Sequence, residues 1–142
     1  MIKMTADFIF IVIFCLFFTI AVDFVMRKLT LTGVDFLFYA PWVIALTSPV
    51  NAIIFAIIIT FVHAAMHSKI APYILLAIPC QLVSIAIAVF LGAGSFFIAL
   101  FVYLGIAILI MFFARVVGGR FVAFLIINFV FNIIVFSLGL FL

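Results

Sequence analysis

Long apolar runs, separated by short polar breaks, form the dominant pattern in this chain of 142 residues. Four of the runs approach the roughly 20 residues that an α-helix needs to cross the hydrocarbon core of a bilayer. They cover residues 8–26, 73–91, 96–114 and 121–142. Two links, "GAGS" at 92–95 and "RVVGGR" at 115–120, are short and contain glycine, which is typical of turns. The pattern predicts membrane-spanning helices joined by tight connections.

A fifth apolar run, residues 36–66, is too long for one crossing. As a continuous helix its 31 residues would extend about 46 Å at 1.5 Å per residue. The run contains "TSPVN" at 47–51, where Pro49 lacks a backbone donor and the polar side chains can satisfy freed backbone groups. We therefore expect residues 47–51 to be non-helical and to separate a short helix at 34–46 from a full helix at 50–66. The alternative is one long, tilted and kinked helix.

The composition identifies lipid as the natural solvent of the chain. It is 74% hydrophobic and 6% charged, whereas ordinary soluble domains are near 45–50% apolar and 25% charged. The sequence therefore predicts an all-α, polytopic integral membrane protein with five or six transmembrane helices, in which residues 1–142 form a single domain. The first apolar run should remain as a membrane helix, because no small-residue cleavage site follows it.

Six cationic residues are scattered between the apolar runs, which is typical of topology signals rather than of a nucleic-acid surface. They are Lys3, Arg27, Lys28, Lys69, Arg115 and Arg120. Cytoplasmic loops carry an excess of Lys and Arg. Five crossings with the amino terminus inside place four of the six cations in the cytoplasm, and six crossings with the amino terminus outside place five there. Both arrangements remain open, and the last three cations share one side in each.

Acidic residues are scarce, and this limits the chemistry of the chain. Asp7, Asp23 and Asp35 are the only acids, and glutamate is absent. Most acid–base enzymes and proton-coupled carriers use carboxylates, and the chain has no nucleophile motif and no phosphate-binding loop, so we expect no enzymatic activity. We expect Asp23 to face the cations that follow it. Asp35 should begin the broken segment, where a carboxylate suits the helix dipole.

Two histidines, His63 and His67, end a stripe of small or weakly polar side chains on the helix expected at 50–66. The stripe runs through Ala52, Ala56, Thr60 and Ala64. Small residues let membrane helices approach closely, and His and Thr can form hydrogen bonds across the contact. We therefore expect both histidines to be packing and boundary residues. His63 should face another helix, and His67 should be more exposed because it lies nearer Lys69.

A metal centre, a haem and a proton-responsive pair are the alternative roles for these histidines. Zinc normally takes three or four protein ligands, and the chain has no third histidine and no HExxH motif. Axial haem ligands approach the iron from opposite faces, which two histidines one turn apart cannot do. Cys15 and Cys80 lie inside apolar runs without a CxxC motif, so we expect buried thiols. The sequence therefore predicts no metal site and no cofactor.

Polar side chains inside the apolar runs form the remaining candidate site. A polar group in lipid is costly unless it is hydrogen-bonded. Such groups either join helices or line a cavity for a solute. The candidates for these two roles are Asn51, Thr60, His63, Gln81, Ser84, Asn128 and Asn132.

The stretch "TGVDFLFYAPWVIALTSPVNAIIFAIIITFVHAAMHSKIAP", residues 32–72, resembles the central part of the rod-shape-determining MreD family. The resemblance rests on Asp35, Trp42, Pro49 and the small-residue helix that follows them. The substrate-binding subunits of energy-coupling-factor vitamin importers have a related layout. The chain departs from MreD proteins, which usually have a carboxylate where it has His63 and usually start inside. The resemblance implies a partner of the cell-wall elongation machinery in a prokaryotic cytoplasmic membrane, without chemistry of its own.

These patterns predict a non-catalytic subunit or scaffold of a larger membrane complex. Its partners would be the lipid bilayer and either other membrane subunits or further copies of the chain. The alternative is a small transporter or a solute-binding membrane subunit. A carrier needs a polar cavity near the midplane of the membrane, whereas a scaffold uses the same polar groups in contacts between helices.

Overall fold

The computed structural model describes residues 6–29, 34–67, 70–115 and 118–139. The elements are α1 (Ala6–Leu29), α2 (Tyr39–Ala45), α3 (Pro49–His67), α4 (Ile70–Leu91), the 3-10 turn η1 (Ala93–Ser95), α5 (Phe96–Phe113) and α6 (Gly119–Ser137). No strand occurs in the described ranges. The all-α prediction is confirmed.

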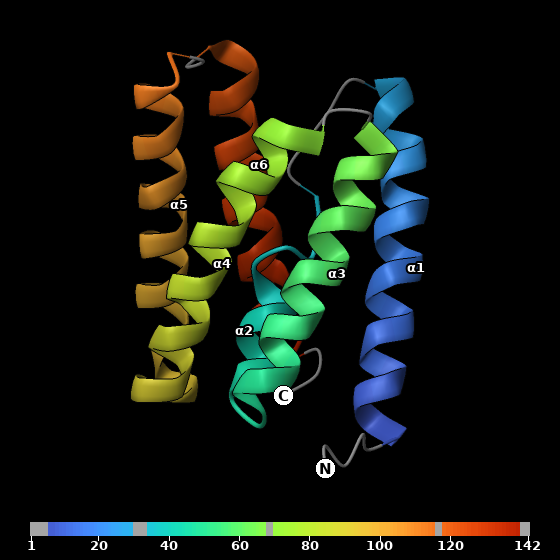
Figure 1. Cartoon of the computed structure of the whole chain (residues 1–142), viewed down its shortest axis with the longest axis vertical. Helices are drawn as coiled ribbons and strands as arrows, with labels where there is room; N and C mark the ends of the chain where they lie inside the picture. The colour runs from blue at the N-terminus through green and yellow to red at the C-terminus, as the bar shows by residue number, and fades with distance from the viewer. Residues whose placement is uncertain (1–5, 30–33, 68–69, 116–117, 140–142) are drawn as a thin grey trace.

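The helices alternate in direction along the chain (Figure 1). α1, α3 and α5 run toward one end of the bundle, and α4 and α6 run back from it. Between α1 and α3 the chain returns through the interior by way of α2. Arg27 and Lys28 belong to the last turn of α1, and Arg115 and Arg120 lie on either side of the α5–α6 link. These positions share one end, which we call the cationic end. Lys69 belongs to the link between α3 and α4, outside the described residues.

Within the residues that the structure describes, three helices are long and apolar enough to cross a membrane. They cover Pro49–Met66, Ala93–Phe113 and Gly119–Ser137. Shorter apolar helices in the described ranges occupy Phe8–Val22 and Leu76–Leu91. Large apolar side chains point outward, and Phe90, Phe113 and Phe17 are 84%, 79% and 73% exposed. An apolar surface of this kind is unusual for a protein in water, so helix length, composition and surface all indicate an integral membrane protein.

The apolar run at 36–66 is broken, as predicted, but the non-helical part is shorter than 47–51. α3 already begins at Pro49, so the last three residues of that range are helical. Proline is favoured at the first helical position, because its missing N–H has no intrahelical acceptor there. Ser48 caps this helix, since its Oγ accepts the Asn51 N–H at 3.5 Å. The alternative of one long kinked helix is wrong.

The short helix expected at 34–46 forms only over α2. Residues 34–38 are non-helical and run through the interior of the bundle (Figure 1). All seven side chains of α2 are buried, because α1, α3, α4 and α6 all contact this helix. A helix that is apolar on every side suits such a position.

Aromatic rings fill the space around α2. Phe96 and Phe136 stack with their centroids 3.9 Å apart, and Trp42 meets Phe96 edge-on at 5.3 Å. The indole N–H of Trp42 donates to Ser95 Oγ at 3.4 Å. Aromatic pairs stabilise a fold by about 0.5–1.5 kcal/mol beyond their burial. These contacts hold α2 against η1 and the start of α5, and the Phe96–Phe136 stack joins α5 to α6.

The remaining links follow the prediction with two differences. Gly92, with a φ of 70°, and η1 form the turn predicted at 92–95. The link predicted at 115–120 is shorter, because α6 already includes Gly119. α6 ends at Ser137 rather than at 142, since Gly139 has a φ of 63°, a left-handed conformation that commonly ends helices. Residues 140–142 lie outside the described residues.

Candidate functional site

The candidate polar residues are all buried. They are Asn51, Thr60, His63, Gln81, Ser84, Asn128 and Asn132, none of which is more than 7% exposed. Gln81 is the twelfth of the 22 residues of α4, and Asn128 is the tenth of the 19 residues of α6. These two side chains therefore lie near mid-depth in the bundle. Polar groups at that depth must find their partners inside the protein.

One chain of hydrogen bonds joins α3 and α4 to the non-helical residues 34–38. Thr60 Oγ1 donates to Gln81 Oε1 at 2.9 Å, and Gln81 Nε2 donates to the Leu37 carbonyl at 2.9 Å. Both side chains come from the middle of long apolar helices. Gln81 thus satisfies a backbone acceptor that has no helical partner.

A second chain of hydrogen bonds runs along α6 to Asp35. Asn132 Nδ2 donates to the Asn128 carbonyl at 2.7 Å and to Asn128 Oδ1 at 3.0 Å. Asn128 Nδ2 then donates to Asp35 Oδ1 at 3.5 Å. The spacing of four residues places both asparagines on one face of α6. We call the set made by both chains the Asp35 centre: Asp35, Leu37, Thr60, Gln81, Asn128 and Asn132.

Both backbone polar groups of Leu37, its N–H and its carbonyl, are hydrogen-bonded to side chains of this centre. Its N–H donates to Asp35 Oδ1 at 3.0 Å, and its carbonyl accepts from Gln81. Non-helical backbone is tolerated at membrane depth only where the protein satisfies its polar groups or a water-filled cavity does. The first physical role of the Asp35 centre is therefore to make residues 34–38 compatible with the interior of the bundle.

Asp35 was not among the candidate site residues and is the main one that sequence reasoning missed. Its side chain is 1% exposed, and it accepts the N–H of the residue two positions on, the local bond of an Asx turn. It lies four residues before α2, so the expectation that it begins the helix is wrong. The signal in the sequence was an ionisable residue beside an apolar run, which marks functional positions in membrane proteins.

The other polar candidates have more local surroundings. Ser84 Oγ donates to the Cys80 carbonyl within α4 at 2.9 Å. Among the described residues, Asn132 Oδ1 and Thr19 Oγ1 are buried oxygens without a hydrogen-bond partner. Cys15 and Cys80 are free and buried, as predicted. The contact expected for Asp23 lies outside the described side chains.

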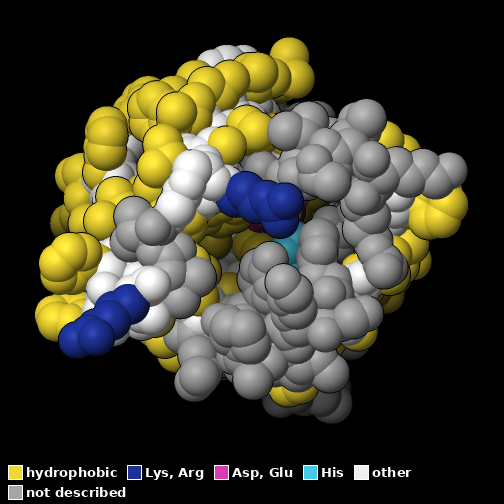
Figure 2. Space-filling view, turned by 90° about the horizontal axis from the view of Figure 1, so that it is seen from above, with side chains coloured by type: hydrophobic (Ala, Val, Ile, Leu, Met, Phe, Trp, Pro, Cys, Tyr) yellow, Lys and Arg dark blue, Asp and Glu magenta, His cyan; other side chains and the backbone are white. Residues whose placement is uncertain are grey.

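His63 is buried, as predicted, on the part of α3 that approaches the cationic end. Figure 2 looks onto that end and shows a central hollow with a histidine side chain inside it and a Lys or Arg side chain beside it. The side chain of His67 is not among those described, so its greater exposure stays a prediction. No cluster of three His, Cys, Asp or Glu side chains that could hold a metal occurs in the described part of the chain.

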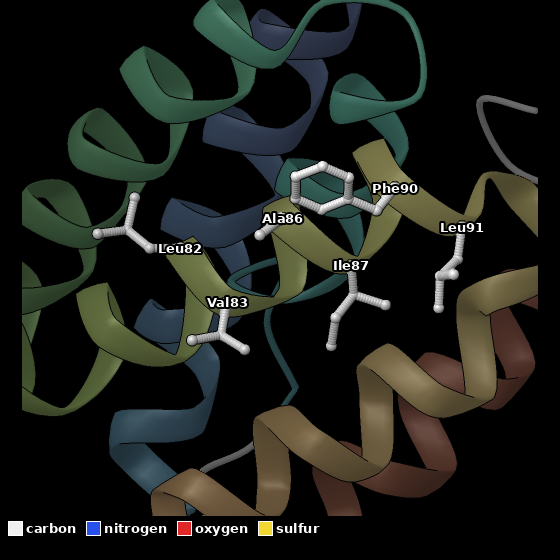
Figure 3. A pocket seen from close by; sticks show the side chains of 6 residues that line it. All are labelled: Leu82, Val83, Ala86, Ile87, Phe90 and Leu91. Atoms are coloured by element: carbon white, nitrogen blue, oxygen red, sulfur yellow. The ribbon is translucent and has the colours of Figure 1, made fainter.

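A groove of about 470 Å³ lies along α4. Its lining consists of Leu82, Val83, Ala86, Ile87, Phe90 and Leu91, whose side chains are spread along one side of the helix (Figure 3). All six residues are apolar. The groove can therefore accept a lipid chain or an apolar helix surface, but it offers no hydrogen bond to a polar solute.

No family model, no curated protein and no solved structure matches this chain.

Proposed function

We propose that this chain is a non-catalytic integral membrane subunit that serves as a scaffold in a larger membrane complex. The hydrogen bonds of the Asp35 centre carry the proposal. Thr60 and Gln81 bond to each other and to backbone, and Asn128 bonds to Asp35. These polar groups are thus used in contacts between elements, which is what a scaffold requires. The groove on α4 is apolar and suits lipid or another membrane helix.

Six passes with the amino terminus outside agree best with the arrangement in Figure 1. Residues 34–38 and α2 together extend at most about 27 Å, at about 3.3 Å per extended residue and 1.5 Å per helical residue. The real span is shorter than this bound, because residues 35–38 form bends and a turn. The stretch nevertheless leads to the α2–α3 turn at the opposite end of the bundle (Figure 1), so we count the return through the interior as one pass. Five of the six cations are then cytoplasmic, in agreement with the positive-inside rule.

The resemblance to the MreD family supports a more specific form of the proposal, in which the complex is the cell-wall elongation machinery of a prokaryotic cytoplasmic membrane. Asp35, Trp42 and Pro49 carry that resemblance. Asp35 precedes α2, Trp42 is buried within it and Pro49 begins α3. His63 stands where MreD proteins usually have a carboxylate, so a partner contact that needs a negative charge there is not expected for this chain.

A solute-binding or transporting membrane subunit is the second candidate, because two features favour it. Transporters often place non-helical backbone near the midplane, where it coordinates substrates and ions. Residues 34–38 form such a stretch. Asn132 Oδ1 is a buried acceptor without a hydrogen-bond partner in the described part of the chain, and a bound solute can donate to it.

Copurification in a mild detergent separates the two candidates. A scaffold should elute with other membrane proteins in a fixed stoichiometry, and crosslinking in intact membranes should recover the same partners. An unrelated membrane protein of similar size and expression level is the matched control and should recover none of them. A chain that elutes alone even after crosslinking, and that gains thermal stability when a solute is added, would contradict the scaffold proposal.

A further inference from the structure

We infer that Asp35 is a proton-binding site in the interior of the bundle, and that Asn128 and Asn132 are positioning residues that orient its carboxyl group. This inference goes beyond the scaffold proposal and does not depend on the identity of any partner. It adds to the chain a group that senses proton activity. The geometry around the carboxyl group carries it.

Asp35 brings a carboxyl group to mid-depth. Its side chain is 1% exposed, and Asn128, which donates to it, lies in the middle of α6. Ionisable residues within membrane segments are rare, and by default they mark ion pathways and proton relays. A full charge is costly in such surroundings, and uptake of a proton removes it.

Two neutral donors hold the carboxyl group in a geometry that suits both protonation states. The N–H of Leu37 and the amide of Asn128 both donate to Oδ1, at 3.0 and 3.5 Å. A carboxylic acid carries its proton on one oxygen and keeps acceptor capacity on the other. Oδ1 can therefore keep both contacts while Oδ2 takes up the proton.

The two asparagines of α6 orient the site and leave one acceptor available. Their amide donors point along the chain of bonds toward Asp35, from Asn132 to Asn128 and from Asn128 to the carboxyl group. Asn132 Oδ1, in a side chain that is 0% exposed, has no hydrogen-bond partner among the described residues. A buried acceptor in this position can receive the O–H of a water molecule that delivers the proton.

Several other titratable side chains are buried in the elements that surround Asp35. They are Cys15 of α1, Tyr39 of α2, His63 of α3, Cys80 of α4 and Tyr103 of α5. The side chains of α6 in the centre are neutral amides, and Arg115 and Arg120 are exposed at the cationic end. His63 lies one turn from Thr60 in the direction of that end. A proton that enters from the cationic end thus meets a titratable group before it reaches the Asp35 centre.

Proton uptake joins a carboxylate and a proton into a carboxylic acid, and no other bond forms or breaks. Hydrogen bonds to a charged acceptor are roughly twice as strong as those to a neutral one. Protonation should therefore weaken the bonds from Leu37 and Asn128 to Oδ1. The consequence is a looser attachment of residues 34–38 to α6, so proton occupancy and the packing of α2 are linked.

Infrared spectroscopy of the full chain in lipid vesicles tests this inference. Asp7→Asn combined with Asp23→Asn leaves Asp35 as the only carboxyl side chain, because the chain has no glutamate. With isotope-labelled aspartate, an acid C=O band should grow as the pH falls, disappear reversibly as it rises, and be lost in Asp35→Asn. Asn128→Leu removes one donor to Oδ1 and should shift the frequency of the band. Ser84→Ala removes a bond within α4 and should leave the frequency unchanged.

Two results would overturn the inference. A labelled band that is absent at every pH at which the protein stays folded means a permanently charged carboxyl group, and a band present at every such pH means a permanently neutral one. An unshifted band in Asn128→Leu would exclude that residue from the positioning role. If Asp35→Asn fails to fold, the band of the Asp7 and Asp23 double variant still decides the question.

Discussion

Gln81 uses both ends of its amide group in the interior of the bundle. It accepts from Thr60 on α3 and donates to the Leu37 carbonyl, each at 2.9 Å. An apolar side chain of similar size would leave a hydroxyl and a backbone carbonyl without these bonds. A buried polar group that loses its partner costs about 1–3 kcal/mol, although hydrogen bonds between membrane helices average only about 0.6 kcal/mol.

We expect Gln81→Leu to lower the free energy of unfolding in mixed micelles by about 1–3 kcal/mol. Ser84→Ala is the matched control, because Ser84 is also buried in α4 but bonds only within that helix, and its loss should cost less. The double variant Thr60→Val/Gln81→Leu should have nearly the same free energy of unfolding as Gln81→Leu alone. The two side chains share one hydrogen bond, so the effects of losing them are not additive. Equal losses for Gln81→Leu and Ser84→Ala would contradict the bridging role.

We expect His63→Gln to preserve assembly, because glutamine retains a hydrogen-bonding group at this buried position. His63→Leu removes that group and should lower stability by about 1–3 kcal/mol, measured by the same unfolding assay. The competing account, a metal or haem site, makes a different forecast. Stoichiometric metal or a Soret band in the purified protein, lost in His63→Ala, would refute the packing role.

At the scale of elements, α2 and the turn before α3 organise the bundle. The turn depends on local chemistry, because Ser48 caps α3 and Pro49 occupies its first position. We expect Ser48→Ala to lower the free energy of unfolding by about 1 kcal/mol, the usual effect of losing an N-cap side chain. Ser137→Ala, an exposed serine at the end of α6, should change it by no more than about 0.5 kcal/mol. A loss of unfolding free energy of similar size in both variants would show that the Ser48 side chain does not cap α3.

The long helices and the turns could be predicted from the sequence, but the hydrogen bonds of the Asp35 centre could not. Apolar runs and glycine-rich links predicted the long helices, and the proline predicted the break before α3. The non-helical stretch at 34–38 depends on partners far away in the chain, since Leu37 bonds to Gln81 and Asp35 bonds to Asn128. A single sequence shows that these groups are polar but not which of them meet. For the same reason Asp35 was placed at a helix start and not at the centre of the site.

At the scale of the whole molecule, six passes and the position of the cations support each other. The end reached by α1, α3 and α5 carries Arg27, Lys28, Arg115 and Arg120. The opposite end contains the α2–α3 turn and η1. The number of passes decides whether residues 34–38 and α2 cross the membrane, which makes the six-pass arrangement central to the proposed topology.

Labelling of single cysteines from outside intact cells tests that claim most directly, with Cys15 and Cys80 replaced by alanine to remove the native thiols. Six passes with the amino terminus outside predict that Thr47→Cys reacts with a membrane-impermeant reagent, whereas Lys28→Cys and Gly118→Cys react only after the membrane is permeabilised. Five passes with the amino terminus inside predict the reverse for Lys28→Cys and Thr47→Cys. Position 28 would then be outside and labelled in intact cells, and position 47 would lie within the membrane and stay unlabelled. Strong labelling of Lys28→Cys or Gly118→Cys in intact cells, or an unreactive Thr47→Cys, would contradict the arrangement.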